Sequence, residues 1–462
     1  MTKGIRTISP IDNSVYVERK YATQDEITQA LDAATTAQKK WKAAPLAERK
    51  KLCTKAVDAF VAKKDEIAKE ICWQMGRPIR SAAGEVAGME ERSRTMIKLA
   101  DQGLTTVKLP EKEGFERWIQ REAIGVVFVV APWNYPYLTA INAIMPAILA
   151  GNTVVLKHSA QTPLCAERLH EAFLAGGLPE GVFQYLHLSH KDTEAVIQDE
   201  RINYIAFTGS VPGGEMVEKA AAGRFIGIGL ELGGKDPAYV RADADIAQAV
   251  DTTMDGAFYN SGQSCCGIER IYVHEDCYDD FLAQAVDWVK NLKLGRSDDP
   301  ETTMGPVVRA SAADFVREQI KEAISQGAVA HISADDFPED KAGSAYLPPQ
   351  VLSNVNHSMR VMTEESFGPV VGIQKVSSDE EAIRLMNDSE YGLTASIFTK
   401  DLDAGVALGQ QVETGTFFIN RCDYLDPELA WTGIKNSGHG CTLSVMGYDS
   451  LTRPKSFHIK KI

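Results

Sequence analysis

The stretch EAIGVVFVVAPWNYP, residues 122–136, decides the fold class. Its apolar run from Val126 to Val130 is far shorter than the roughly 20 residues that cross a bilayer, and its β-branched residues favour a buried strand. Further short runs follow at residues 153–156, 204–207, 225–230 and 238–240, with helical patterns at 163–175 and 213–222 between them. Strands that alternate with helices predict a parallel sheet covered on both faces.

A second alternating series begins near Asp236 and continues to Asn420, with a long amphipathic helix expected over residues 278–292. A chain of 462 residues is also too long for one hydrophobic core. We therefore expect an α/β fold made of two Rossmann-like parallel-sheet domains that join near residue 233.

The two ends of the chain have other patterns. Thr23 and Glu26 form a capping-box signature, and apolar residues at helical spacing predict helices through most of the first hundred residues. Residues 115–121 and 456–460 each predict a strand that has no partner nearby in the sequence. We expect these two strands to pair in a small projecting β arm whose open edge suits subunit pairing.

The formal net charge is −14, which disfavours a nucleic-acid surface because such a surface needs basic side chains. No apolar run is long enough for a membrane span, and the first residues, MTKGIRTISPIDNS, lack the apolar core of a secretory signal. The eight cysteines include no CxxC pair and the nine histidines no HExxH motif, so we expect no bound metal and no disulfide framework. These features predict a cytoplasmic protein.

The segment FYNSGQSCCGIER, residues 258–270, contains the first candidate for chemistry. Cys265 follows Gly262-Gln263-Ser264, a small and flexible approach that lets a ligand reach the thiol. A single cysteine is more often a small buried hydrophobic residue, and the segment alone leaves that alternative open. Cys266 points the other way in an extended chain and is interpreted as structural, although a strained disulfide between the two is conceivable.

Two strand ends carry further candidates. Glu231 ends an apolar strand in GLELGGKDP, residues 229–237, where burial raises the pKa of a carboxyl group toward that of a general base. Its alternative is an ion pair with Lys235 or a helix cap. Asn134 in APWNYP, residues 131–136, follows a buried strand and is placed to donate to an oxyanion. Its alternative is an ordinary turn asparagine.

A third strand end, FTGSVPGG at residues 207–214, opens a helix. We expect Gly209, Ser210 and Gly214 to leave backbone N–H groups free at the helix N-terminus, where a phosphate binds well. A GxGxxG dinucleotide motif is absent, because Leu232 occupies the third glycine position of the nearest match. Spacing alone is weak evidence for a dinucleotide site.

Together these segments resemble the aldehyde dehydrogenase superfamily. The matching motifs occur in the family's order along nearly the whole chain: PWN, K-x-x-x-Q-TP at 157–163, FTGS, E-LGGK, F-x-N-x-GQ-x-C, EESFGP at 364–369 and GT-x-x-IN at 415–420. The resemblance implies an NAD(P)-binding domain (1–110 and 124–233), a catalytic domain (234–435) and an oligomerisation arm (111–123 and 436–462). It also implies an aldehyde substrate and a homodimer or homotetramer.

The resemblance assigns roles to single residues. Cys265 would attack the aldehyde as a thiolate, Asn134 and the backbone N–H of Cys265 would hold the oxyanion, and Glu231 would activate the water that hydrolyses the thioester. NAD or NADP would contact Pro132, Trp133, Lys157, Ser159, Ala160, Gly209, Ser210, Gly214, Leu232, Glu365 and Phe367. Tyr135 and Trp431 would line the substrate funnel.

The departures from the family pattern matter as well. Ala160 stands where NAD-preferring members carry a glutamate, so NADP should be tolerated. Thr442 and Ala143 replace a glutamate and a lysine that some members use as a proton relay. Asn142 replaces an arginine found in succinate-type enzymes, which argues mildly against an anionic substrate, whereas aromatic residues including Tyr137 and Tyr424 favour an apolar or aromatic aldehyde.

Three alternatives remain open. A CoA-acylating dehydrogenase would lack the hydrolytic glutamate, whereas Glu231 is present. A cysteine hydrolase would need a histidine base, and none lies in the segments that contain Cys265, Glu231, Asn134 and Ser210. A non-catalytic protein would have no need of Cys265, Glu231 and Asn134 together.

Overall fold

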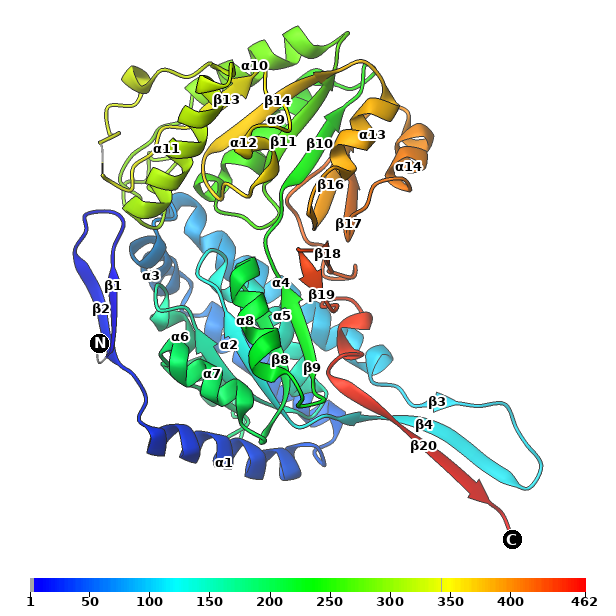
Figure 1. Cartoon of the computed structure of the whole chain (residues 1–462). Coiled ribbons are helices and arrows are strands. Elements are labelled where there is room, and N and C mark those ends of the chain that lie inside the picture. The colour runs from blue at the N-terminus through cyan, green and yellow to red at the C-terminus, as the bar shows by residue number, and fades with distance from the viewer. Residues whose placement is uncertain (1–3, 342) are drawn as a thin grey trace.

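The structure, a computed structural model, describes residues 4–341 and 343–462 and contains two large sheets, one in each half of the molecule (Figure 1). The first sheet has six strands, parallel except for β19. Their spatial order is β19 (Gly438–His439), β9 (Gly227–Glu231), β8 (Ile202–Thr208), β5 (Val126–Ala131), β6 (Thr153–His158) and β7 (Phe183–Tyr185). The strand predicted at residues 126–130 is thus at the centre of this sheet, buried along its whole length.

Helices cover both faces of the first sheet, and the alternation along β5 shows why. Val126, Phe128 and Val130 pack against one helical layer, and Val127 and Val129 against the other. The first layer contains α1 (Gln24–Trp41), α7 (His190–Gln198) and α8 (Val211–Ala221). The second layer contains α2 (Leu46–Val61), α3 (Lys64–Met75), α4 (Ile79–Gly103), α5 (Pro136–Leu149) and α6 (Pro163–Ala175).

The second sheet has seven strands, parallel except for β12. Their order is β12 (Val329–Ala330), β13 (Gln350–Ser353), β14 (Val370–Val376), β11 (Ile268–His274), β10 (Asp236–Val240), β16 (Thr394–Phe398) and β17 (Thr416–Ile419). Its helices are α9 (Ile246–Phe258), α10 (Tyr278–Lys290), α11 (Ala310–Ser325), α12 (Arg360–Thr363), α13 (Asp379–Asn387) and α14 (Leu402–Gly409). Two covered sheets of this kind confirm the predicted α/β fold class.

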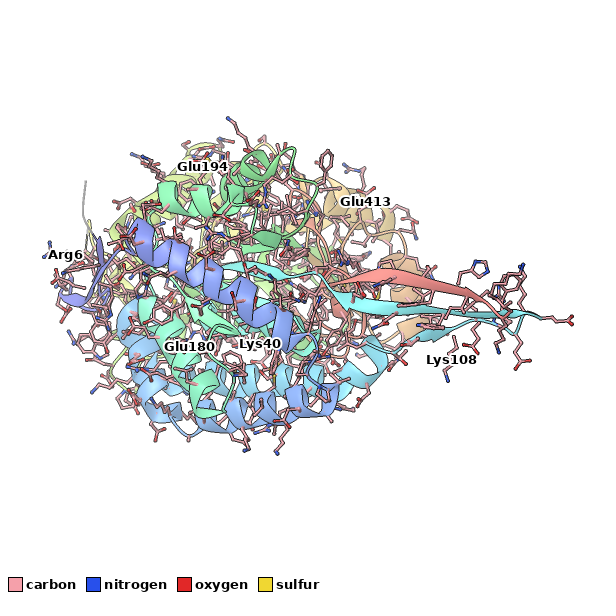
Figure 2. The ribbon with its side chains drawn as sticks, turned by 90° about the horizontal axis from the view of Figure 1, so that it is seen from below. Arg6, Lys40, Lys108, Glu180, Glu194 and Glu413 are labelled. Atoms are coloured by element: carbon pink, nitrogen blue, oxygen red, sulfur yellow. The ribbon has the colours of Figure 1, made fainter. Side chains whose placement is uncertain are left out.

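The predicted arm projects away from the body (Figures 1 and 2). Strand β20 (Thr452–Lys460) pairs antiparallel with β4 (Phe115–Ala123), which also pairs with β3 (Val107–Lys108). The rings of Trp118 and Phe457 stack with centroids 4.6 Å apart across this pairing. The pairing of the two segments far apart in the sequence is therefore confirmed. The chain from residue 436 first adds β19 to the first sheet and only then enters the arm.

Local expectations were met to different degrees. The Thr23 capping box forms with Glu26 as predicted. The hairpin of β1 (Gly4–Ile8) and β2 (Val15–Lys20) and the small pair β15 (Tyr391–Gly392) and β18 (Ile434–Lys435) were not predicted. Phe225, expected to begin a strand, lies exposed before β9 with a φ of 55°. Among the described residues, no helix is both long and apolar enough to span a bilayer.

Candidate active site

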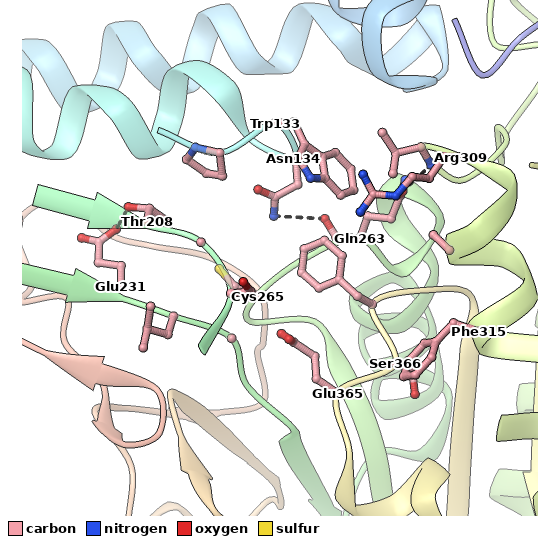
Figure 3. A pocket seen from close by; sticks show the side chains of 18 of the residues that line it. Trp133, Asn134, Thr208, Glu231, Gln263, Cys265, Arg309, Phe315, Glu365 and Ser366 are labelled. Atoms are coloured by element: carbon pink, nitrogen blue, oxygen red, sulfur yellow. Dashed lines mark hydrogen bonds between the residues drawn. The ribbon is translucent and has the colours of Figure 1, made fainter. Parts of the chain in front are cut away.

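Two cavities meet at Cys265, between the carboxyl ends of β5, β8 and β9 in the first sheet and the amino ends of β11 and β14 in the second sheet. Figure 3 shows the first of these cavities. The first cavity has a volume of about 390 Å³ and is lined by Trp133, Ser210 and Phe367 among others. The second cavity has a volume of about 570 Å³ and is lined by Tyr135, Tyr424 and Trp431 among others. Cys265 and Glu231 line both cavities, so a ligand in each would have access to the same sulfur atom.

The loop before Cys265 has an unusual backbone. Asn260 and Ser261 adopt positive φ angles of 53° and 58°, and Gly262 follows at 72°. A β-carbon at Gly262 would lie 2.3 Å from the carbonyl oxygen of Gly368, so only glycine fits there. Residues held in such sparsely populated conformations cluster at functional sites. This turn carries the chain from α9 to the point between the sheets where Cys265 lies.

The two adjacent cysteines have different surroundings. Cys265 is partly exposed to both cavities, whereas Cys266 is buried, and its thiol and the Ser264 hydroxyl donate to the carboxyl group of Asp423. A hydrogen bond with Cys265, together with burial, raises the pKa of the Cys266 thiol well above its usual value. Both cysteines are free thiols. The interpretation of Cys266 as structural agrees with these contacts, and Cys265 is the thiol that faces both cavities.

Asn134 is held beside this loop by three contacts. Its side-chain Nδ2 donates to the carbonyl oxygen of Gln263 at 3.3 Å, and Figure 3 shows the amide directed toward the cavity centre. Its own carbonyl oxygen accepts hydrogen bonds from Arg77 and Asn260. Since an amide nitrogen carries two protons and Gln263 takes one, a second donor remains for an oxyanion near Cys265.

Glu231 ends β9, and two hydroxyl groups hold its carboxylate. Thr442 donates to Oε1 at 2.6 Å and Thr208 to Oε2 at 3.1 Å. Burial raises the pKa of Glu231, and these two hydrogen bonds lower it in part. The alternative ion pair with Lys235 does not form, because the Lys235 ammonium binds Glu269 and the hydroxyl of Ser366. Thr442, at the position of the missing relay glutamate, therefore supplies a hydroxyl to the carboxylate of Glu231.

Substitution Thr442→Val is expected to move the acidic limb of the pH–rate profile to higher pH. The hydroxyl stabilises the ionised carboxylate of Glu231, so its loss raises a pKa that burial has already raised. One hydrogen bond of about 1 kcal/mol corresponds to roughly 0.7 pH unit. The measurement is the rate of acid formation against pH. Thr442→Ser keeps the hydroxyl and is the control; equal profiles for both variants would contradict this role.

The first cavity collects most of the predicted cofactor contacts. Its lining contains Pro132, Trp133, Gly209, Ser210, Leu232, Glu365 and Phe367. The Trp133 and Phe367 rings meet edge to face at 5.7 Å. Oε1 of Glu365 accepts from the backbone N–H of Gly234, and burial raises the pKa of Glu365 to about 8. A β-carbon at Gly233 would lie 2.2 Å from this carboxyl group, so the glycine leaves space for it.

Four predicted contacts lie outside this cavity: Gly214, and three residues at the carboxyl end of β6. Ala160 is exposed, and its carbonyl oxygen accepts from Thr7. Lys157 is partly buried, has no ion-pair partner among the described residues, and burial lowers its pKa to about 8. A buried ammonium group without an anion is stabilised by polar groups of a ligand. Lys157 therefore fits the ribose and phosphate half of a dinucleotide, with Ser159 beside it.

The expectation of free backbone N–H groups in the FTGSVPGG loop is wrong for both glycines. The N–H of Gly209 donates to the carbonyl oxygen of Glu231 at 3.0 Å, and that of Gly214 donates to Ser210 within α8. Ser210 is the N-cap of α8, and its hydroxyl accepts from Gly213. Gly214 packs against Leu232 and does not line the first cavity. Only Ser210 and the surface of Gly209 remain available to a ligand.

The second cavity contains the predicted funnel residues Tyr135 and Trp431 together with Tyr424. Tyr137, also expected at the mouth, is instead fully buried and packs edge to face against Phe60, because it lies on the core-facing side of α5. The sequence reasoning missed Thr208, Asp423, Arg77 and Arg92. Arg92 comes from the charged run EERSR, which looks solvent-facing, and Arg77 follows the glycine at the end of α3, so only their burial distinguishes them. In the described part of the chain, no cluster of side chains suits a metal ion.

The chain is similar to known proteins along nearly its whole length. Residues 1–457 match the model of the family described as "Aldehyde dehydrogenase family". An aldehyde dehydrogenase from Paenarthrobacter nicotinovorans is 34% identical over 447 residues, 96% of this chain and 97% of that protein. Succinate-semialdehyde dehydrogenase [NADP(+)] 1 from Mycobacterium tuberculosis is 32% identical, with 96% and 97% covered. Succinic semialdehyde dehydrogenase from Streptococcus pyogenes, solved with NADP⁺, has a TM-score of 0.94 at 31% identity, covering 99% of this chain and 100% of that chain.

Proposed function

The chain belongs to the aldehyde dehydrogenase family and is an NAD(P)-dependent aldehyde dehydrogenase, and we propose that it forms a carboxylic acid through a thioester on Cys265. The observation that carries this proposal is the position of Cys265 on the wall of both cavities, with Glu231 and Asn134 beside it. One cavity would hold the dinucleotide and the other the aldehyde.

The residues of the site have distinct parts in the proposed reaction. The Cys265 thiolate attacks the aldehyde carbon, and the Asn134 amide and the backbone N–H of Cys265 donate to the oxygen that becomes negative. A nicotinamide dinucleotide held by Ser210, Glu365 and Phe367 would supply the acceptor for the hydride that leaves this carbon. Glu231 then takes a proton from water, whose oxygen attacks the thioester carbon and displaces the Cys265 sulfur. The products are the carboxylic acid and the regenerated thiol.

Two alternatives make different predictions. A CoA-acylating enzyme has no need of a general base, whereas here Thr208 and Thr442 hold Glu231 in place. A cysteine hydrolase needs a histidine near its nucleophile, but the residues that line the two cavities include none. His158, which lies in the segment 157–163, is buried and hydrogen-bonded to the carbonyl of Pro136 and the hydroxyl of Thr162.

The test is an aldehyde panel assayed with NAD and with NADP, followed by product analysis with and without CoA. We expect reduced dinucleotide and free acid in equal amounts, and no dependence on CoA. Since Ala160 places no carboxylate near a 2′-phosphate, NADP should support turnover. An acyl-CoA product, or acid released without reduction of the dinucleotide, would contradict the proposal.

Substitution Asn134→Ala is expected to lower kcat about a hundredfold, the usual loss for one oxyanion donor. The backbone carbonyl of residue 134 would still accept from Arg77 and Asn260, so the loop should keep its position. Turnover of the panel's best aldehyde gives the measurement, and unchanged dinucleotide binding is the control. A near-neutral effect on kcat would remove Asn134 from the oxyanion site.

We also propose the predicted division into an NAD(P)-binding domain, a catalytic domain and the β arm, with the arm mediating a homodimer or homotetramer. The supporting feature is the exposed outer edge of β20, whose backbone is available for pairing with another chain. Sedimentation at micromolar concentration would test it, and a monomer would contradict it. The cytoplasmic location expected from the scattered cysteines remains a prediction.

A further inference from the structure

One arginine of the second cavity is buried without a counter-ion. Arg92 lies in α4 with only 8% of its surface exposed, although its segment EERSR, residues 90–94, reads as a solvent-facing charged run. Among residues 4–341 and 343–462 it forms no ion pair with any carboxylate. A buried, unpaired charge is costly, so its presence calls for a compensating ligand.

The hydrogen bonds of Arg92 use only part of its guanidinium group. Nη1 donates to the carbonyl oxygen of Leu138 at 2.9 Å and to Oδ1 of Asn142 at 3.0 Å. Nε and Nη2 donate to no described residue, and neither is among the fully shielded unpaired atoms of the described chain. Since Arg92 lines the second cavity, these two nitrogens have their accessible surface on that cavity.

The most deeply buried arginines of the protein behave differently. Arg77 and Arg270 are each 1% exposed, and every guanidinium nitrogen of both has an acceptor. Arg77 also forms an ion pair with Glu85. Burial lowers the pKa of Arg92, and Glu85, already paired with Arg77, offsets this only in part. Arg92 is thus the arginine of this cavity whose donors remain available.

The free edge of Arg92 is the edge that binds carboxylates elsewhere in the chain. Nε and Nη2 of Arg19 donate to the two oxygens of Glu167, at 2.6 and 2.9 Å. The same two nitrogens of Arg201 hold Asp199, and those of Arg241 hold Asp379. This edge presents two parallel N–H groups that match the geometry of a carboxylate.

The acidic groups of the cavity are already engaged or have a raised pKa. Glu85 is paired with Arg77, and Glu91 accepts from the hydroxyl of Tyr424. Burial raises the pKa of Asp423 to about 7, and it accepts from Ser264 and Cys266; burial also raises the pKa of Asp255. Glu231 also lines the cavity; it accepts from Thr208 and Thr442, and its charge, like that of Glu85, partly offsets the lowering of the Arg92 pKa. None of these carboxyl groups forms an ion pair with Arg92, so its Nε and Nη2 remain available to a substrate.

From these contacts we propose that Arg92 binds the carboxylate of the substrate, and that the enzyme oxidises semialdehydes of dicarboxylic acids. The proposal rests on the proposed function, because Cys265 must receive the aldehyde end in the same cavity. This proposal replaces the earlier expectation that the substrate is not anionic, which was drawn from Asn142 alone. The short Asn142 side chain leaves room for a cation that comes from α4 and uses Asn142 as a hydrogen-bond acceptor.

The test compares three aldehydes of similar length: succinate semialdehyde, the neutral pentanal and the cationic 4-aminobutanal. We expect kcat/KM of the wild-type enzyme to be highest for the carboxylate. In Arg92→Met the ratio of kcat/KM for succinate semialdehyde to kcat/KM for pentanal should fall about a hundredfold, as when one partner of a buried charge pair is removed. Arg92→Lys keeps the charge but loses the two parallel N–H groups. Its preference for succinate semialdehyde should lie between those of the wild type and Arg92→Met.

Arg80→Met is the matched control, since Arg80 is an exposed arginine of the same helix; it should match the wild type for all three aldehydes. Equal losses for pentanal and succinate semialdehyde in Arg92→Met would show a positioning role and overturn the proposal. A wild-type preference for pentanal or 4-aminobutanal would overturn it as well, and this comparison needs no variant.

Direct binding separates this proposal from the proposed function. Succinate, the product of the test substrate, can be titrated against the wild type and Arg92→Met in a calorimeter, with no turnover required. We expect the variant to bind it about a hundredfold more weakly. If no aldehyde reduces the dinucleotide but Arg92-dependent succinate binding persists, the proposed function fails and the carboxylate site stands. Equal binding by both proteins overturns the site.

Discussion

Cys265→Ala is expected to lower the turnover of every aldehyde by about 10⁴-fold or more, because removal of a nucleophile ends covalent catalysis and leaves only binding and oxyanion stabilisation. Cys265 is the thiol that lines both cavities, while its neighbour Cys266 is buried and bound to Asp423. Cys266 is therefore not positioned to replace it. The measurement is the rate of reduced dinucleotide formation with the best aldehyde and saturating NAD or NADP.

Two controls would show that the loss of turnover is due to the missing thiol. Dinucleotide binding and the temperature of unfolding should be unchanged in Cys265→Ala, since the side chain is small and only partly buried. Cys277→Ser is the matched control: Cys277 lies at the N-terminus of α10, and its thiol bonds to Arg241 and His274 carbonyls are ones a serine hydroxyl can also make. Substantial turnover by Cys265→Ala would place the nucleophile elsewhere.

Glu231→Gln is expected to separate the two halves of the reaction. Acylation of Cys265 should still occur and release about one equivalent of reduced dinucleotide per site, while hydrolysis should slow by about 10²- to 10⁴-fold, the usual contribution of a general base. Glutamine has the shape of glutamate: its oxygen still accepts from one of the two threonine hydroxyls, and its amide N–H can donate to the other, so the geometry is retained. A pre-steady-state burst and the mass of an acyl adduct on Cys265 are the two measurements.

The matched control is Glu218→Gln in α8, where an exposed glutamate pairs with the exposed His439. It removes one carboxylate from the same domain and should leave both phases unchanged. A loss of the burst itself in Glu231→Gln would mean that Glu231 acts before the thioester forms. A burst followed by normal turnover would mean that another group activates the water.

Much of this architecture could be predicted because its signals are local. The apolar run at 126–130, the alternation of strands with helices and the capping box at Thr23 each depend on neighbouring residues, and each forms as expected. The relative positions of the motif residues at strand ends could also be predicted, because the carboxyl ends of parallel strands share one edge of a sheet. This is why Asn134, Ser210 and Glu231 could be expected near one another.

Other features could not be read from local patterns. The sequence offers Lys235 as a partner for Glu231, but the ammonium group binds Glu269, which lies on the neighbouring strand β11. Tyr137 is the same residue type as Tyr135, two positions earlier. It lies on the core-facing side of α5, however, and is fully buried. The N–H of Gly209 was expected to be free, and a cross-strand contact with Glu231 occupies it.

By itself, then, the sequence determined the fold class, the order of the strands and helices along the chain and the motifs that carry Cys265, Glu231 and Asn134. These depend on periodicity and on residue types within a few positions of one another. Only the tertiary structure decided which charges are compensated. Arg92 belongs to a run that looks exposed, and its burial beside Asn142 results from the packing of α4 on α5. Burial and pairing depend on contacts between residues far apart in the chain, so no local pattern specifies them.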